Sequence, residues 1–433
     1  MTIFDFTCDF YFREGYATFL MVEYLKKKKQ TTQKEINEKM NIPKSNFRRA
    51  QQKEFVGYTK LIEKMAGYFG IPVDIDKSVI DDLNEQFSQF YTCICFSKIH
   101  EAKAYFDNMV ANFSSYDNTI LIVPYYLAQL IYYVSDINYT NKVNFAKIEE
   151  AVAVLEWFVE KMSTEHRFLY YEYMTSYNGI IKNHENVVHF ARLTLYMAAN
   201  FPDLEPTANY HVSFSYSMVG DFINALIYAN KALPKLEEQL NYQKAVFCRM
   251  NIAALYKKLG NVDEAKRMLK KNLIYLNFND IPRLDTVTYL NYADCMLMED
   301  KFQDALKYYE KIEKASVKKP EYESVLIVYC LYKLKEMDRA TEYIETLNAL
   351  YAEDKFPIAY LSLIQFFKAY FEKGTATEII RRYKAAQEHM AQYRLRGQYI
   401  QDIAQEMYER TQSIKAAAKG NKIIDSSAYV NLM

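Results

Sequence analysis

Three stretches of the chain align without gaps and decide its fold: YHVSFSYSMVGDFINALIYANKAL (residues 210–233), MNIAALYKKLGNVDEAKRMLKKNL (residues 250–273) and LNYADCMLMEDKFQDALKYYEKIE (residues 290–313). Each begins 40 residues after the one before it. In all three, an amphipathic segment leads into a turn and a second amphipathic segment follows. Self-similarity at a fixed period of this size is typical of an α-solenoid, in which pairs of helices stack on one another.

The positions that the copies share explain how their two segments could pack as a pair of helices. A residue that suits a tight turn separates the segments, at Gly220, Gly260 and Asp300. Five positions later each copy has a small residue, at Ala225, Ala265 and Ala305. The turn residue allows a left-handed backbone, and the alanine allows two helices to approach closely. A fourth copy with Ala340 at the small position and a fifth copy with Gly374 at the turn extend the array.

The composition of the whole chain agrees with a helical fold. Its 433 residues include 10 Gly and 9 Pro, far below the roughly 12% of average proteins. So few turn formers do not suit a β-sandwich, a barrel or an α/β fold. Hydrophobic residues make up 50% of the chain, which is ample for a packed core and excludes a wholly disordered protein. We therefore predict an all-α protein.

The repeats resemble the tetratricopeptide repeat, whose unit is a pair of antiparallel helices joined by a tight turn. The resemblance implies a right-handed α-solenoid whose concave surface is a natural peptide groove. We expect degenerate copies upstream of the clear ones, for example in SYNGIIKNHENVVHFARLTLY (residues 176–196). About nine helix pairs would then fill residues 75–418.

Ahead of the repeats, the sequence predicts a module of short helices. YATFLMVEYLKKKK (residues 16–29) is an amphipathic stretch that ends in four lysines, which suit a helix C-terminus. Thr32 followed by Glu35 is a capping-box pattern and starts a second short helix. After a proline-containing turn, SNFRRAQQ (residues 45–52) predicts a third helix. The stretch YTKLIEKMAGYFGI (residues 58–71) predicts a fourth.

Two short helices joined by a tight turn form a helix-turn-helix pattern. The module resembles the helix-turn-helix domain of the lambda-repressor and xenobiotic-response-element type. TQKEI (residues 32–36) stands where that family has T-Q-x-E-L, NIPKS (residues 41–45) matches its turn, and IEKMAGYFGIPVD (residues 62–74) resembles its closing helix. It departs from the family at AQQK (residues 50–53), where a hydrophobic residue, a glutamate and a glycine are common. The resemblance implies that the second helix of the pair enters the major groove of double-stranded DNA. The candidate DNA-binding residues are Gln33, Lys44, Ser45, Asn46, Arg48, Arg49 and Gln52.

The charge balance and residue types of this module suit nucleic acid. Residues 26–70 contain twelve Lys or Arg and four acidic residues, a net charge of +8, whereas the whole chain has a net charge of zero. Arg can pair with guanine through two hydrogen bonds, Asn and Gln can do so with adenine, and Lys neutralises phosphates. The alternatives are a solvated charged face and a helical bundle that only resembles a DNA-binding domain.

A polar column recurs within the repeats. His211, Asn251 and Asn291 occupy the same position in three successive copies. An Asn side chain can pair with both the N–H and the C=O of an extended peptide, and so recognises its backbone whatever its sequence. The alternative is that these side chains bond to a neighbouring helix or to water. With neighbours that could add selectivity, the candidate peptide-binding residues are Tyr210, His211, Arg249, Asn251, Tyr289, Asn291 and Asp294.

The sequence offers no support for catalysis, a metal or a cofactor. Cys93 and Cys95 are the only close pair of cysteines, and a zinc site would need a second pair of ligands. His184 and His189 flank a motif with one residue too many for a zinc protease, so on a helix they would lie about 140° apart. Sparse cysteines, an N-terminus without the basic stretch of a signal peptide and no run of about 18 apolar residues predict a cytoplasmic protein without membrane contact.

A helix-turn-helix domain followed by tetratricopeptide repeats resembles one group in particular, the peptide-pheromone-responsive regulators of Gram-positive bacteria (Rgg, Rap, NprR, PlcR and PrgX). The resemblance implies a homodimer that binds DNA through paired N-terminal domains and a short signalling peptide in the repeat groove. We expect a DNA-binding domain at residues 1–72, a repeat domain at residues 73–418 and a tail at residues 419–433.

Two other readings of the same architecture remain open. One is a Rap-like protein whose N-terminal helices bind a response regulator or another protein. Such a protein would have no need of the basic recognition helix. The other is a repeat scaffold without a small ligand, which would bind neither DNA nor peptide.

Overall fold

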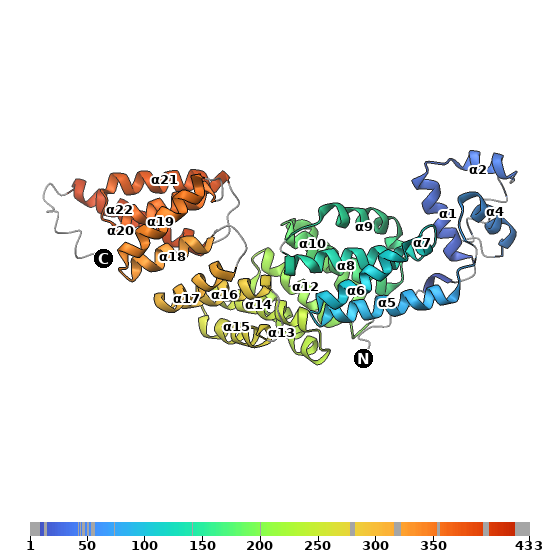
Figure 1. The fold of residues 1–433 in the computed structure, drawn as a ribbon, viewed down its shortest axis with the longest axis horizontal. Helices are drawn as coiled ribbons and strands as arrows, with labels where there is room; N and C mark the ends of the chain where they lie inside the picture. The colour runs from blue at the N-terminus through green and yellow to red at the C-terminus, as the bar shows by residue number, and fades with distance from the viewer. Residues whose placement is uncertain are drawn as a thin grey trace. The chain divides into compact units, whose positions relative to one another are not determined.

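The computed structural model describes a chain in which all assigned secondary structure is helical, and the all-α prediction is confirmed (Figure 1). The described residues are 9–12, 15–41, 43, 45, 48–49, 52, 57–72, 74–140, 142–199, 201–277, 282–315, 322–352, 356–392 and 398–420. The chain forms two compact units, residues 1–284 and 285–433. The boundary between them falls inside the repeats, and the expected domain boundary at residue 72 stays a prediction.

The first unit begins with the N-terminal module. Its described helices are α1 (Tyr16–Lys28), α2 (Gln33–Met40) and α4 (Thr59–Phe69). The predicted capping box at the start of α2 is confirmed: Thr32 Oγ accepts from the Glu35 N–H (3.3 Å) and Glu35 Oε2 accepts from the Thr32 N–H (2.7 Å). Helix α4 ends at Gly70, whose left-handed backbone (φ 71°) stops the helix. The third predicted helix lies largely outside the described residues.

Five helices follow, and one of them, α8, lies at the centre of the packing. They are α5 (Lys77–Cys95), α6 (Ile99–Ala111), α7 (Phe113–Tyr116), α8 (Ile122–Thr140) and α9 (Phe145–Phe158). Helix α8 is apolar on nearly every face because α5, α6, α9 and α10 (Thr164–Ile180) all pack against it. Among its central residues, Leu127, Leu130 and Ile131 are fully buried.

The remainder of the first unit consists of regular helix pairs. They are α10 with α11 (His184–Ala198), α12 (Glu205–Met218) with α13 (Phe222–Glu238), and α14 (Tyr242–Lys258) with α15 (Val262–Leu276). Each helix packs against the next one along the chain. The pairs α12/α13 and α14/α15 coincide with the first two aligned copies, so the predicted period is structural.

The second unit continues the same pattern. Its helices are α16 (Pro282–Met298), whose first three residues precede the boundary, α17 (Phe302–Ala315), α18 (Tyr322–Lys333), α19 (Met337–Ala352), α20 (Ile358–Phe371), α21 (Ala376–Gln392) and α22 (Gln398–Gly420). Over the described part of the chain, the helices from α5 to α21, leaving out the single-turn α7, form eight consecutive pairs. About nine pairs were expected from the sequence.

The turns confirm the predicted role of the repeat positions, with one correction. Gly220, Gly260 and Asp300 are left-handed, with φ of 83°, 78° and 57°, and Ala225, Ala265, Ala305 and Ala340 are fully buried. In the fifth copy the left-handed residue is Lys373 (φ 60°), not Gly374. Glycine is needed at 374 for a different reason: a Cβ atom there would lie 2.8 Å from the carbonyl oxygen of Ala369.

Candidate functional site

The described candidates for DNA binding lie on the surface of the N-terminal module. Ser45, Arg48, Arg49 and Gln52 are exposed. Gln33 is the first residue of α2, and its Nε2 donates to Asn37 Oδ1 (2.9 Å). Two further candidates, Lys44 and Asn46, lie outside the described residues.

The C-terminal end of α1 adds positive charge to this module. Lys27, Lys28 and Lys29 are all exposed. The ammonium group of Lys29 lies 5.7 Å from the centre of the Phe69 ring in α4, and that of Lys28 lies 5.6 Å from the Tyr24 ring. Aromatic faces thus support part of the basic run. The exposed lysines leave room for phosphate contacts, which position a protein on a duplex without reading its sequence.

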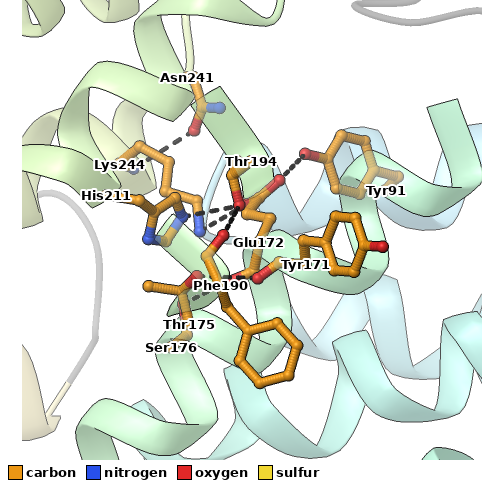
Figure 2. Close-up of polar contacts among 10 residues, drawn as sticks. All are labelled: Tyr91, Tyr171, Glu172, Thr175, Ser176, Phe190, Thr194, His211, Asn241 and Lys244. Carbon is orange, nitrogen blue, oxygen red and sulfur yellow. Dashed lines mark hydrogen bonds and ion pairs between the residues drawn. The ribbon is translucent and has the colours of Figure 1, made fainter. Parts of the chain in front are cut away.

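Of the predicted peptide column, His211 lies in a buried charged cluster. It is 1% exposed, and its Nε2 lies 4.0 Å from Oε1 of Glu172, a fully buried residue of α10. The ammonium group of Lys244, from α14, lies 2.7 Å from the same carboxylate oxygen (Figure 2). Side chains from α10, α12 and α14, the first helices of three successive pairs, therefore meet at one point.

The charges of this cluster depend on one another. Burial alone would raise the pKa of Glu172, but Lys244 and His211 outweigh burial and hold that pKa below its usual value. Burial is the main influence on His211 and lowers its pKa, although Glu172 acts in the opposite direction. At neutral pH the cluster thus contains a carboxylate–ammonium pair beside a neutral imidazole.

Helix α5 contributes a fourth side to the cluster. The hydroxyl group of Tyr91 donates to Oε2 of Glu172 (3.5 Å; Figure 2). Burial raises the pKa of the neighbouring Cys95 thiol to about 12, with the negative charge of Glu172 as a further cause.

Two polar residues of this unit have an unpaired buried atom. Thr207 and Asn241 are each 1% exposed, and neither the Thr207 hydroxyl oxygen nor the Asn241 amide nitrogen has a hydrogen-bond partner among the described residues. A buried polar atom without a partner costs free energy, so each of these atoms is a weak point in the packing around α12 and α14.

Of the other candidates in the first unit, Tyr210 contacts this cluster and Asn251 joins two of its helices. The Tyr210 ring meets the His211 ring edge-on at 4.9 Å. Asn251, which is partly exposed, donates from Nδ2 to Ser213 Oγ (2.7 Å) and so joins α14 to α12.

Arg249 joins three helices of the first unit. It donates from Nε to Asn272 of α15 (2.6 Å) and from Nη1 to Glu237 of α13 (2.5 Å). It is 6% exposed, so its guanidinium already has protein partners on both sides. These contacts hold α14 in place between its neighbours.

Two of the candidates in the second unit, Tyr289 and Asp294, join α16 to α17. Asp294 accepts from the Tyr309 hydroxyl (2.9 Å), and the Tyr289 hydroxyl accepts from Lys311 Nζ (2.7 Å). Asn291 donates from Nδ2 to the Val287 carbonyl of its own helix (2.8 Å). Their roles in peptide binding stay predictions.

Sequence reasoning missed the two residues at the centre of the cluster, Glu172 and Lys244. The sequence does carry a signal for Glu172, since it is the one charge within LYYEYM (residues 169–174). A charged residue inside an otherwise apolar and aromatic run is rarely buried unless it is paired. Lys244 has no such signal because it stands near the start of its helix, where exposed lysines are common.

Within the described ranges, no group of three or more His, Cys, Asp or Glu side chains is placed to hold a metal ion. Cys93 and Cys95 are both buried, free cysteines. Among the helices that the structure describes, none combines the length and apolarity that a membrane span requires.

Stacked pairs of antiparallel helices, with a left-handed residue at the turns and an alanine at the close contact, define an α-solenoid of the tetratricopeptide type. Solved structures of this class align with the chain over most of its length. The apo form of the quorum sensor NprR from B. thuringiensis aligns with a TM-score of 0.56 at 17% identity, covering 79% of this chain and 100% of the NprR chain. A Rap protein complexed with Competence and Sporulation Factor gives a TM-score of 0.55 at 13% identity, covering 78% of this chain and 99% of the other.

NprR in complex with its cognate peptide NprX also aligns, with a TM-score of 0.51 at 17% identity, over 79% of this chain and 99% of the NprR chain. These likenesses show that the chain shares the fold of NprR and Rap proteins. No protein-family profile matches the sequence, and no curated protein sequence is significantly similar to it.

Proposed function

We propose that this protein is a cytoplasmic, homodimeric transcriptional regulator, without catalytic activity of its own, whose repeats bind a short signalling peptide that modulates DNA binding. The observation that carries the peptide part is the meeting of α10, α12 and α14, the first helices of three successive pairs, at the Glu172, His211 and Lys244 cluster. Solved proteins of the same fold bind peptides, as the NprR complex with NprX does.

The DNA part rests on the exposed basic residues of the N-terminal module. A single short recognition helix reads few base pairs, so two modules on paired half-sites are expected, and the homodimer follows from this. If the module binds no DNA, the Rap-like alternative is favoured, in which the N-terminal helices bind a response regulator or another protein.

Asn251→Ala and Asn291→Ala should each weaken peptide binding by about 1 to 3 kcal/mol, because each removes a polar group that pairs with the peptide backbone. Calorimetric titration of synthetic peptides encoded by short reading frames beside the gene would measure this. Asn230→Ala, at an exposed position of α13, is the matched control and should leave affinity unchanged. Unchanged affinity in both test variants would refute this site.

Arg48→Ala and Arg49→Ala should each cost about 1 to 3 kcal/mol at the specific DNA site if these residues read bases, whereas Lys27→Ala should weaken binding to all sequences alike. Fluorescence anisotropy with the promoter upstream of the gene and with a scrambled duplex separates the two effects. Lys307→Ala, exposed in the second unit, serves as the control. Wild-type affinity that does not fall between low and physiological salt would rule out duplex binding of this kind.

A further inference from the structure

The N-terminal module is packed onto the repeats of the first unit. The 3-10 helix η1 (Asp9–Phe12), which precedes α1, places Tyr11 in the core, where it is fully buried. The Tyr11 hydroxyl lies 3.0 Å from Nδ1 of His166 near the start of α10, and the two rings stack with centroids 5.7 Å apart. The chain segment before the module is therefore anchored on α10.

A second contact holds α1 against α9. Tyr24 is 8% exposed, and its ring lies 5.5 Å from the Trp157 ring and 5.0 Å from the Phe158 ring. The ammonium group of Lys161 also lies over the Trp157 ring, 3.9 Å from the ring centre. The buried residues of α1, such as Leu20, belong to one continuous hydrophobic core with those of α5, α8 and α10.

Helix α10 connects this anchor to the charged cluster. His166 contacts Tyr11, and Glu172, six residues further along α10, contacts Lys244. Six residues of α-helix span about 9 Å. Both residues belong to one regular helix, α10, so the position of one is linked to the position of the other.

We propose that two contacts, of η1 with α10 and of α1 with α9, hold the N-terminal module against the repeats; we call these two contacts the clamp. We also propose that α10 transmits changes at the Glu172 cluster to that module. This role for α10 rests on the proposed function, since it gives a ligand bound beside Glu172 a route to the DNA-binding residues. The clamp excludes a module that swings freely on a linker. Peptide binding would then act by moving or releasing a docked module.

The chain has a single tryptophan, and it lies in the clamp, so its fluorescence reports this contact directly. Tyr24→Ala should shift Trp157 emission to longer wavelength and increase hydrogen exchange in α1 by roughly tenfold or more. Tyr11→Phe removes only the hydroxyl and should increase α1 exchange roughly twofold to tenfold. Tyr68→Ala, which removes an α4 ring packed on Phe69, is the control and should leave Trp157 emission unchanged.

The role of α10 is tested by substituting residues of the Glu172 cluster and measuring Trp157 emission and hydrogen exchange in α1. Glu172→Gln and the double variant Glu172→Leu with Lys244→Met should each alter Trp157 emission and raise α1 exchange roughly twofold or more, with a smaller change in α13. Unchanged emission and α1 exchange in both variants would overturn transmission through α10. If Tyr24→Ala increased hydrogen exchange in α1 and in α13 by the same factor, the loss of protection would not be specific to α1, and the clamp would be overturned. The full-length protein is used without DNA or peptide, so failure here is distinct from failure of the proposed function.

Discussion

Lys244→Met should lower the free energy of unfolding by about 3 to 5 kcal/mol, because it leaves the carboxylate of Glu172 buried without its charged partner. The Lys244 side chain is 6% exposed and that of Glu172 is fully buried, so solvent cannot replace the lost ammonium group. The carboxylate must then stay charged in an apolar environment or take up a proton, and both cost free energy. Urea unfolding monitored by Trp157 fluorescence would measure the loss within the first unit.

A second pair of charges supplies the control. Lys235 and Glu238 form an ion pair of similar length (2.9 Å), but both side chains are mostly exposed, so Lys235→Met should change stability little. Combining Glu172→Leu with Lys244→Met removes both buried charges and should restore much of the lost stability. A double variant as unstable as Lys244→Met alone would show that the ion pair is not the cause.

The capping box and the helix pairs could be predicted from the sequence because they depend on residues that are close together in the chain. The capping box of Thr32 and Glu35 involves atoms three residues apart, and the turn at Gly260 followed by Ala265 lies within one helix pair. Such signals depend on the backbone that immediately surrounds them. The period of 40 residues then places the equivalent positions of successive pairs in register, which defines the array without any knowledge of long-range contacts.

The candidate site could be predicted only in part, because a repeat register indicates which helix face a residue shares but not what packs over it. His211 was expected in an open column with Asn251, and the structure encloses it between α10 and α14 next to Glu172. The partner on α5, Tyr91, lies outside the clear repeats and carries no repeat signature. Tyr11 and His166 are also distant in sequence, so no local pattern could reveal the anchor.

Acidification from pH 7 to pH 4 should destabilise the first unit, with His166 alone contributing up to about 3 kcal/mol. Burial lowers the pKa of His166 to about 4, whereas an unfolded histidine titrates near 6.5. Between these two values the unfolded chain binds a proton that the folded chain does not, so unfolding becomes more favourable as the pH falls. His211, whose pKa burial also lowers, acts in the same direction. Glu172 adds to the loss at lower pH, because its pKa is held below the usual value.

Urea unfolding followed by Trp157 fluorescence at pH 7, 5.5 and 4.5 would measure this dependence. His166→Gln keeps a polar group opposite Tyr11 but cannot be protonated in this range, so it should unfold with a shallower dependence on pH than the wild type. His184→Gln, at an exposed position at the start of α11, should keep the wild-type dependence. Equal pH dependence in the wild type and in His166→Gln would mean that the buried imidazole does not limit stability in acid. The loss of stability would then have to come from other groups, such as His211 and Glu172.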